Sequence, residues 1–234
     1  MGLPIFYLQD FSGNSNIELN EETSRHIVQV LRMQVGSLIQ LTNGKGRLLN
    51  AEITSAHKKK TLVKTIREQN IAPAENKITI AISPIKNISR FEWFLEKATE
   101  IGVNEIIPLI CQRTEKEKLR TDRLQQIIIN AMLQSQQVWL PVLHEQTIFK
   151  NVLANATHEN KFIAHCEDGE KNNFYYEVKE SKSSIILIGP EGDFTTDEIR
   201  EAIQKNFTPV SLGENRLRTE TAGVVAATLL RFKK

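Results

Sequence analysis

The sequence is poor in cysteine and has no grouped histidines. Its 234 residues include two cysteines, Cys111 and Cys166, which match neither a C-x-x-C motif nor a zinc-ligand spacing. The five histidines form no H-E-x-x-H motif, and His165 and Cys166, adjacent at the end of a predicted strand, would point to opposite faces if the strand continued through them. We therefore expect no metal site and a reduced, cytoplasmic setting.

Signatures of several other protein classes are also missing. No G-x-G-x-x-G motif follows a predicted strand, which argues against a standard dinucleotide site and a Rossmann-type methyltransferase. Gly44-Lys45-Gly46 lacks the spacing of a P-loop, and Ser135 and Ser211 lack the surroundings of a nucleophile elbow. No apolar run approaches about 18 residues and no signal-peptide pattern opens the chain, so we expect neither a membrane span nor a secreted protein.

Positive charge is concentrated in the N-terminal third of a nearly neutral chain. The sequence carries 30 Lys and Arg against 28 Asp and Glu, a formal net charge of +2. Residues 1–72 hold nine Lys and Arg against six Asp and Glu, a balance of +3, and residues 73–234 hold 21 against 22, a balance of −1. A phosphate backbone is therefore expected to meet the N-terminal third first.

The first 70 residues predict short strands separated by turns. The predicted strands are residues 37–42, 47–54 and 61–66. The turn Asn43-Gly44-Lys45-Gly46 is typical of hairpins, and a short helix is predicted around residues 21–31. This pattern indicates a small, mostly β, barrel-like module, which ends in the polar segment 68–76 around Pro73.

From Lys77 onward the pattern alternates between strand and helix. Strands are predicted at residues 78–82, 106–110, 161–164, 185–188 and 209–212, and helices at 89–101, 124–133, 196–207 and 219–232. Ser89 with Glu92 and Thr195 with Glu198 have the spacing of capping boxes, and Gly102 is a typical helix end. The alternation predicts a parallel α/β sheet covered on both faces.

Three predicted strands end in unusual loops. These are His165-Cys166-Glu167, Gly189-Pro190-Glu191-Gly192 and Leu212-Gly213-Glu214. Ligands bind beyond the carboxyl ends of strands in open α/β sheets, and glycine lets the backbone approach a ligand closely. A single loop of this kind is also compatible with a plain turn, but two glycine loops together indicate a ligand site.

The densest polar run is Arg216-Leu217-Arg218-Thr219-Glu220-Thr221-Ala222, at the start of the last predicted helix. A capped helix N-terminus accounts for Thr219 as the cap and for Glu220, which the helix dipole favours. It does not account for Arg216 and Arg218, because the dipole disfavours positive charge at this end. The arginines therefore indicate anion binding.

Together these motifs closely resemble the RsmE family, whose members methylate N3 of a uridine in small-subunit (16S) ribosomal RNA. The resemblance rests on Ile188 to Gly192, Leu212-Gly213 and Leu217 to Ala222. Further matches extend over nearly the whole chain, at His26, Val30-Leu31-Arg32, Gly36, Lys97 to Val103, Pro108, Arg113, Gln134-Ser135 and Pro141.

The resemblance implies an architecture, a cofactor and partners. Residues 1–72 would form a PUA-like RNA-binding domain, and residues 73–234 a SPOUT methyltransferase domain with a parallel sheet and a C-terminal trefoil knot. The cofactor would be S-adenosylmethionine, and the substrate 16S ribosomal RNA in the assembled small subunit. The family likeness also implies a homodimer that needs neither a membrane nor a metal.

The resemblance further implies roles for individual residues. Methylation of uridine N3 requires a base that removes its proton or a cation that stabilises the uridinate. Arg218 is the expected stabiliser, and Glu191 and Glu220 are alternative bases, each equally compatible with a structural role. Cofactor contacts are expected from His165, Leu187, Ile188, Gly189, Pro190, Glu191, Gly192, Leu212, Gly213, Leu217, Arg218, Thr219 and Ala222. RNA contacts are expected from Arg32, Lys45, Arg47, Lys58, Lys59, Lys60, Arg113 and Arg216, with a solvated charged face as the alternative for the lysines.

Several positions depart from the family pattern. Asp193 stands where the family often has glycine, Asn215 and Arg216 stand where arginine and isoleucine are usual, and Gln137 replaces an arginine. The start Gly2-Leu3-Pro4 also lacks an arginine common near this position. These departures leave the cofactor loops intact and bear on the RNA contacts.

Three other functions fit parts of the pattern. They are a SPOUT enzyme acting on a ribose 2′-hydroxyl or a transfer-RNA base, a non-catalytic RNA-binding assembly factor, and a plain nucleotide-binding α/β protein. The Lys97 to Val103 and Arg218 to Ala222 segments favour the uridine enzyme. The intact glycine loops and Arg218 favour an enzyme over an assembly factor, and binding of S-adenosylmethionine rather than ATP or NAD would separate the possibilities.

Overall fold

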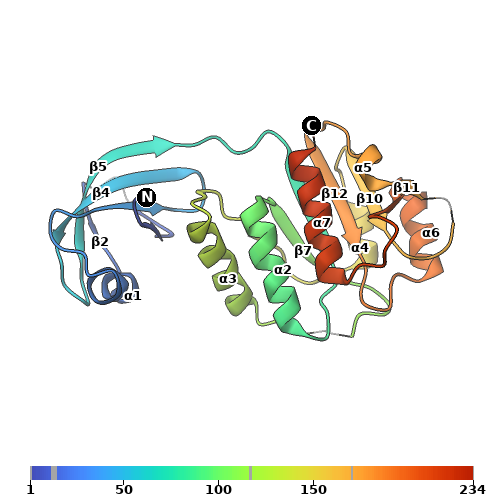
Figure 1. The fold of residues 1–234 in the computed structure, drawn as a ribbon, viewed down its shortest axis with the longest axis horizontal. Helices are drawn as coiled ribbons and strands as arrows, with labels where there is room; N and C mark the ends of the chain where they lie inside the picture. The colour runs from blue at the N-terminus through green and yellow to red at the C-terminus, as the bar shows by residue number, and fades with distance from the viewer. Residues whose placement is uncertain (1, 12–14, 116–117, 170, 234) are drawn as a thin grey trace. The chain divides into compact units, whose positions relative to one another are not determined.

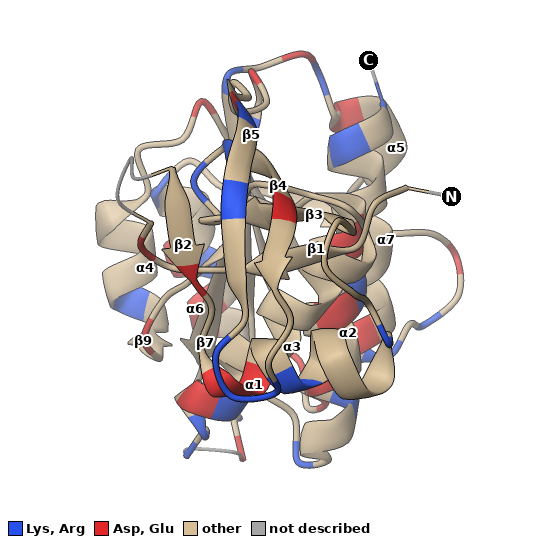
Figure 2. Ribbon diagram, turned by 90° about the vertical axis from the view of Figure 1, so that its left-hand side faces the viewer, with Lys and Arg blue, Asp and Glu red and all other residues tan. Residues whose placement is uncertain are grey.

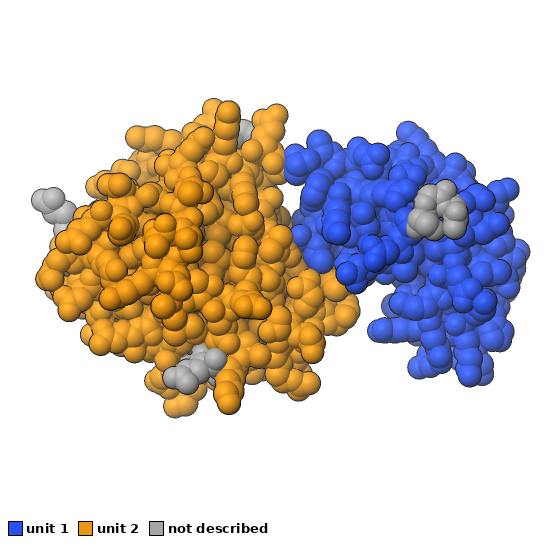
Figure 3. Space-filling model, turned by 180° about the vertical axis from the view of Figure 1, so that it is seen from behind, with its two compact units in different colours: residues 1–73, 132–140 blue, residues 74–131, 141–234 orange. Residues whose placement is uncertain are grey.

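The structure is a computed structural model that describes residues 2–11, 15–115, 118–169 and 171–233. Contacts divide the chain into two compact units, coloured separately in Figure 3. Unit 1 comprises residues 1–73 and 132–140, and unit 2 comprises residues 74–131 and 141–234. Each unit has its own sheet and its own hydrophobic core, so each is described by itself (Figure 1).

Unit 1 is built on a five-stranded sheet. Its strands are β1 (Ile5–Tyr7), β2 (Asn16–Glu18), β3 (Leu38–Thr42), β4 (Arg47–Ser55) and β5 (Leu62–Asn70), in the spatial order β1-β3-β4-β5-β2. β1 runs parallel to β3 and the other pairs are antiparallel. Two register shifts along β4 and β5 bend the sheet. Within the described residues β1 and β2 form its two edges, so the barrel-like module is an open sheet.

A helix and a widened turn connect β2 to β3. Helix α1 (Glu21–Arg25) begins after Asn20, whose side chain accepts a hydrogen bond from the Thr23 amide, and continues as a π-helical turn, η1 (His26–Val30). Ile27 is fully buried in the unit 1 core. Arg32, just beyond the turn, has a φ of +54°, a left-handed conformation that side chains rarely adopt.

A segment distant in sequence completes unit 1. The indole Nε1 of Trp139 donates to the carbonyl oxygen of Ile71 at 3.0 Å, and the amide of Leu140 donates to the Gly44 carbonyl at 2.8 Å. Gly46 has a φ of +84°, and a Cβ there would overlap the Trp139 ring. Residues 132–140 therefore pack with the β3–β4 hairpin, which the local sequence pattern does not indicate.

Unit 2 is built on a parallel sheet of eight strands. They are β6 (Lys77–Ile82), β7 (Glu105–Ile110), β8 (Val142–Leu143), β9 (Thr147–Ile148), β10 (Asn160–Ala164), β11 (Asn172–Asn173), β12 (Ser183–Ile188) and β13 (Thr208–Ser211). Their spatial order is β11-β13-β10-β12-β6-β7-β8, and β9 also pairs with β7. All these pairs are parallel. The predicted parallel α/β fold is thereby confirmed.

The helices of unit 2 connect and cover these strands (Figure 1). They are α2 (Ile88–Ile101), α3 (Thr121–Gln134, whose end belongs to unit 1), α4 (Phe149–Asn155), α5 (Phe174–Glu177), α6 (Thr196–Gln204) and α7 (Thr219–Phe232). α7 packs on α2 and β6 at Gly223, where a Cβ would lie 2.6 Å from the Phe94 ring and 2.8 Å from Ile82. A larger residue at Gly223 would therefore push the helix off the sheet.

Local helix-end predictions were partly right. Thr195 and Glu198 form the predicted capping box, and Gly102 ends α2 with a φ of +93°. The predicted box at Ser89 is wrong, because the cap of α2 is Asn87, whose side chain accepts from the Ser89 amide. Thr219 is likewise not a cap, because it is the first residue of α7 and its hydroxyl donates to the carbonyl oxygen of Gly189.

No helix in the described part of the chain is both long and apolar enough to cross a membrane.

Candidate functional site

Three strand ends meet at the carboxyl edge of the unit 2 sheet. β13, β10 and β12 are neighbours in that order, so the loops that follow them begin side by side. These are the loops that the sequence singled out, at residues 165–167, 189–192 and 212–214. The start of α7 follows the last of them. Residues separated by some fifty positions in the chain thus come together where parallel sheets usually bind ligands.

A cavity of about 380 Å³ lies at this edge. Its volume is within the range of small-molecule sites, roughly 300–1,000 Å³. Its lining combines apolar, acidic and basic residues: Arg90, Ala164, Cys166, Ile188, Gly189, Pro190, Glu191, Asp193, Arg216, Leu217, Arg218, Thr219, Glu220 and Ala222. We call it the carboxyl-edge cavity.

Buried contacts hold residues 189–192, which we call the glycine loop, against the start of α7. The hydroxyl of Thr219 donates to the carbonyl oxygen of Gly189 at 3.1 Å. Beneath the loop, the fully buried Phe194 lies so close to Gly189 that a Cβ there would be 3.1 Å from the Phe194 ring. A side chain at Gly189 would therefore press on Phe194, so glycine lets this backbone lie close to the core.

The cavity wall carries three arginines and three carboxylates of unequal exposure. Glu220 is only 7% exposed and its Oε1 lies 3.8 Å from Nε of Arg90, on α2. Glu191 is exposed and its Oε2 accepts a hydrogen bond from the Lys86 amide at 3.4 Å. Arg216 and Arg218 are exposed just before α7, where the unpaired amides of the helix N-terminus add positive potential. The site thus presents cationic groups and one accessible carboxylate.

Two side chains tie the loops of the site together. Asp193 accepts a hydrogen bond from the Cys166 amide at 2.7 Å, which connects the loop after β12 to the loop after β10. Arg113, predicted to contact RNA, directs its Nη1 to the carbonyl oxygen of Gly192 at 2.7 Å. The Arg113 side chain therefore lies against the glycine loop and does not line the cavity.

Most of the predicted catalytic and cofactor residues converge in this cavity. All three predicted catalytic residues, Arg218, Glu191 and Glu220, line it, as does the predicted RNA ligand Arg216. So do the predicted cofactor residues Ile188, Gly189, Pro190, Glu191, Leu217, Arg218, Thr219 and Ala222.

Five predicted cofactor residues do not line the cavity. Leu187 is fully buried in the core below it, and Gly192, Leu212 and Gly213 lie in the flanking loops. His165 is half-buried, and its Nδ1 has no hydrogen-bond partner among the described residues. Burial, with the nearby Lys171 ammonium, lowers the pKa of His165 and keeps the imidazole neutral at physiological pH.

Four lining residues were not predicted to belong to the site: Arg90, Ala164, Cys166 and Asp193. Arg90 lies in the first turn of α2, where the helix dipole disfavours a positive charge, as it does at Arg218. An arginine at a predicted helix start could therefore have identified Arg90 from the sequence. Cys166 adjoins the predicted His165. Asp193 was noted only as a departure from the family pattern.

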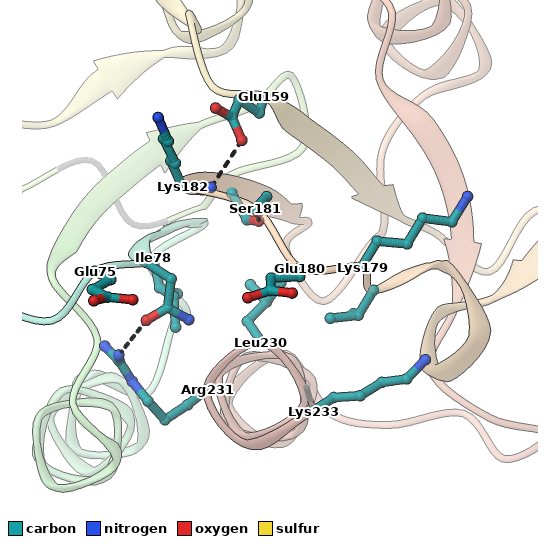
Figure 4. Close-up of a pocket in the computed structure, with 13 residues that line it drawn as sticks. Glu75, Ile78, Glu159, Lys179, Glu180, Ser181, Lys182, Leu230, Arg231 and Lys233 are labelled. Carbon is teal, nitrogen blue, oxygen red and sulfur yellow. Dashed lines mark hydrogen bonds between the residues drawn. The ribbon is translucent and has the colours of Figure 1, made fainter.

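A larger concavity of about 840 Å³ lies at the opposite, amino-terminal edge of the sheet (Figure 4). It is lined by Lys179, Lys182, Arg231 and Lys233 together with Glu75, Glu159 and Glu180, so its charges nearly balance. No glycine lines it. Size alone would favour this concavity, but its chemistry and its position at the amino ends of β6 and β12 do not indicate a cofactor site.

The predicted RNA-binding residues of unit 1 differ in whether their charge is paired with a carboxylate of the protein. Arg47 forms a bidentate ion pair with Glu68, and Nζ of Lys60 lies 2.7 Å from Oε2 of Glu18. Arg32, Lys45, Lys58 and Lys59 are exposed. In Figure 2 acidic residues are coloured on β2 and β4 and basic residues on β5, so both signs of charge occur along these strands.

The described residues contain no group of three or more histidine, cysteine, aspartate or glutamate side chains that could hold a metal ion.

Comparisons with known proteins agree with this geometry. A family model for an RNA methyltransferase domain matches residues 72–231, and one for an RNA methyltransferase PUA domain matches residues 19–66. Ribosomal RNA small subunit methyltransferase E of Rickettsia conorii is 31% identical over 226 residues, which cover 94% of this chain and 91% of the relative.

Two solved structures extend the likeness to three dimensions. A probable rRNA methyltransferase from Porphyromonas gingivalis superposes with a TM-score of 0.91 at 36% identity, covering 98% of each chain. A ribosomal RNA small subunit methyltransferase E from Neisseria gonorrhoeae, bound to S-adenosyl methionine, superposes with a TM-score of 0.84 at 29% identity, covering 97% of this chain and 95% of that chain.

A parallel α/β unit with a carboxyl-edge cavity, preceded by a PUA domain, defines an RNA methyltransferase. The chain belongs to the ribosomal RNA small subunit methyltransferase E family. The predicted enzyme class and the predicted PUA-like domain are thereby confirmed.

Proposed function

We propose that this protein transfers a methyl group from S-adenosylmethionine to N3 of a specific uridine in small-subunit (16S) ribosomal RNA. The observation that carries this proposal is the convergence of the glycine loop, the α7 start and the arginines on one cavity. Membership of the small-subunit methyltransferase family supports the substrate. The N3 position follows from the resemblance and from the chemistry of the residues present.

The residues of the carboxyl-edge cavity fit this cofactor. Ile188, Leu217 and Ala222 offer apolar surface for an adenine ring, and the backbone at Gly189 can approach it without a side chain. Arginines beside a helix N-terminus suit the carboxylate of the methionine part. When bound, S-adenosylmethionine supplies an electrophilic methyl group on a sulfonium centre. The Neisseria gonorrhoeae relative binds this cofactor, which supports the same use here.

The unequal exposure of the carboxylates suggests a division of roles. A general base must come within hydrogen-bond reach of the proton it removes. Glu191 is exposed at the cavity, so we assign it to remove the N3 proton, whereas the buried Glu220 is engaged by Arg90 and holds the α7 start in place. Arg218, exposed and adjacent to the α7 N-terminus, stabilises the uridinate.

Unit 1 would supply RNA affinity without reading the target base. Arg32, Lys45, Lys58 and Lys59 are exposed and free to meet phosphates, while Arg216 would contact RNA at the cavity itself. We propose an RNA-binding domain at residues 1–72 and a methyltransferase domain at residues 73–234, of which residues 132–140 belong to the compact unit 1. We also propose a C-terminal trefoil knot and the assembled small subunit as substrate, in the cytoplasm where these subunits form.

We also propose a homodimer. The family likeness implies it, and the helices α2 and α7 expose Trp93 (43%) and Phe232 (69%), apolar side chains of the kind that subunit interfaces cover. Light scattering coupled to size-exclusion chromatography would give twice the monomer mass of 26.7 kDa.

The decisive experiment uses purified protein, radiolabelled S-adenosylmethionine and small ribosomal subunits from cells that lack the endogenous activity. Nuclease digestion and mass spectrometry then locate the label. Label on N3 of one uridine of 16S RNA is the expected result. Label on a ribose would keep the methyltransferase class and overturn the base specificity, and absence of both label and cofactor binding by calorimetry would favour an RNA-binding assembly factor.

A further inference from the structure

Asp193 adopts a backbone conformation that would suit glycine better. Its φ is +63°, in the left-handed region that costs an L-residue conformational energy. Aspartate tolerates this region better than most residues because its short side chain can bond to nearby backbone. Here both carboxylate oxygens do so: Oδ1 accepts from the Phe194 amide at 2.8 Å, and Oδ2 accepts from the Cys166 amide at 2.7 Å.

The Phe194 side of this bridge is firmly anchored. Phe194 is fully buried, and its ring centroid lies 5.6 Å from that of Phe149. The amide of Asp193 itself donates to the Pro190 carbonyl at 2.9 Å, which closes the turn of the glycine loop. The Asp193 side chain is therefore held at a defined place relative to the unit 2 core.

The Cys166 side of the bridge has far less support. β10 ends at Ala164, and Cys166 lies exposed two residues beyond the strand. Its amide has Asp193 as its acceptor, across 27 residues of sequence. Both Cys166 and Asp193 line the carboxyl-edge cavity. The bridge thus joins one wall of the cavity to the other at the point where the β10 loop leaves the sheet.

We propose that Asp193 is a positioning residue: it holds the loop after β10 against the glycine loop and so preorganises the cavity for its cofactor. This inference rests on the proposed function. Asp193 acts through geometry, because both of its oxygens are used by backbone amides rather than directed at a ligand. Preorganisation of this kind raises affinity by lowering the ordering cost of binding.

The test compares Asp193→Gly, Asp193→Asn and the wild-type protein. Glycine relieves the backbone strain, so Asp193→Gly folds but loses the bridge. Asparagine keeps one side-chain oxygen that can accept from Cys166, loses the bond from the Phe194 amide, and tolerates the left-handed conformation. Asp197→Asn is the matched control, because Asp197 lies on the same segment with its side chain 88% exposed.

Two measurements are made on each protein. Hydrogen exchange of the Cys166 amide, without cofactor, reports the bridge directly. Calorimetry gives the affinities for S-adenosylmethionine and for S-adenosylhomocysteine, which lacks the positive charge on sulfur. We expect Asp193→Gly to lose the exchange protection and to bind both compounds about tenfold more weakly. Asp193→Asn should retain protection and lose less than threefold, and Asp197→Asn should match the wild type.

Two results would overturn the inference. One is an Asp193→Gly protein with unchanged exchange at Cys166 and unchanged affinities. The other is a selective loss of S-adenosylmethionine binding in both Asp193 variants, which would mean that the charge acts directly on the sulfonium. If the wild-type protein bound neither compound, the proposed function would fail, and the exchange measurement would still decide whether the bridge exists.

Discussion

Arg90 on α2 and Glu220 on α7 face each other across the wall of the carboxyl-edge cavity, with Nε 3.8 Å from Oε1. Glu220 is nearly buried, whereas the Arg90 side chain is 40% exposed. The pair connects the first turns of two helices that also pack together at Gly223. Arg90 therefore neutralises a buried carboxylate at the point where the cavity is assembled.

Replacement of Arg90 should expose the cost of burying Glu220. Arg90→Met should lower the free energy of unfolding by about 1–2 kcal/mol, less than for a fully buried pair because Arg90 is partly solvated. The double variant Arg90→Met with Glu220→Gln should lose less than the sum of the single losses. Urea denaturation of all four proteins measures the coupling, and additive losses would show that the two side chains do not interact.

The assignment of the base predicts opposite kinetic effects for the two glutamates. Glu191→Gln should lower kcat by about 100-fold or more with little change in cofactor affinity, as expected for loss of a general base. Glu220→Gln should instead act on stability and cofactor binding, with kcat within about tenfold of wild type. Single-turnover methyl transfer at saturating cofactor separates the cases, and the reverse pattern would make Glu220 the base.

Loss of Arg218 should affect the chemical step. Arg218→Ala removes the cation placed to stabilise the uridinate and should reduce kcat by about 100-fold. Arg218→Lys keeps the charge without the planar fork and should recover part of the rate. Because an anion is easier to form at higher pH, raising the pH should partly rescue Arg218→Ala, and a variant with wild-type kcat would remove Arg218 from the mechanism.

The lysine run in unit 1 should contribute to RNA binding through salt-dependent phosphate contacts. Removal of one phosphate contact lowers the slope of log affinity against log salt by about one. Lys58 and Lys59 are exposed, and Lys60 is paired with Glu18, so Lys58→Gln, Lys59→Gln and Lys60→Gln together should lower the slope by about two. Filter binding of small-subunit RNA at several salt concentrations provides the slope.

A matched set of charge removals in unit 2, Lys150→Gln with Lys179→Gln and Lys182→Gln, serves as the control for the lysine run and should leave the slope unchanged. An unchanged slope in both triple variants would assign Lys58, Lys59 and Lys60 to an ordinary solvated face.

Arg231 should matter for stability at the amino-terminal edge of the unit 2 sheet. Its Nη1 donates to Oδ1 of Asn76 at 2.9 Å, which is the dashed line drawn from Arg231 in Figure 4. Its Nη2 donates to the Gly102 carbonyl and to Oδ1 of Asn104. Arg231→Met removes the arginine donor from Oδ1 of Asn76 and from the Gly102 carbonyl, whereas Oδ1 of Asn104 keeps its bond from the Ile78 amide, and the change should cost about 2–4 kcal/mol by chemical denaturation. Arg231→Lys should recover less than half, and full recovery would show that charge alone suffices.

The protein should lose stability as the pH falls through the histidine range. Burial lowers the pKa of His158, against the opposing effect of Glu105 and with the help of Lys77 and Lys161. Nε2 of His158 lies 2.9 Å from Oγ1 of Thr79. The unfolded chain therefore takes up a proton that the folded protein resists, so stability is complete above about pH 6.5 and falls below it.

Urea denaturation at pH 7.5, 6.5 and 5.5 would measure this loss, which for one proton is at most about 1.4 kcal/mol per pH unit. His158→Gln should flatten the profile, with His57→Gln as the control because His57 is exposed. The same decline in both variants would place the titrating group elsewhere, and His165, whose pKa burial also lowers, would be the next to replace.

Sequence reasoning succeeded where the signal is local. Three predictions lie within two residues of the observed elements: the strands at 78–82 and 185–188, which match β6 and β12, and the helix at 219–232, which matches α7. Each strand is a continuous apolar run and the helix is apolar over several turns, so the signal is contained in the segment itself. It missed β1, β2, β8, β9, α4, β11 and α5, which are short elements with little periodicity. The cap of α2 was misplaced by two residues because Asn87 and Ser89 carry equally good capping side chains.

The sequence by itself determined the class of the enzyme and the chemistry of its loops. The glycines of 189–192 and the arginines before α7 each lie within a few consecutive positions, so the sequence alone indicates a ligand site and anion binding there. Only the tertiary structure decided which other residues join them. Strand order sets β10 beside β12 and packs α2 on α7, which brings Cys166 to Asp193 and Arg90 to Glu220. These pairs are separated by 27 and 130 residues, and no local pattern records contacts that arise from the packing of a whole sheet.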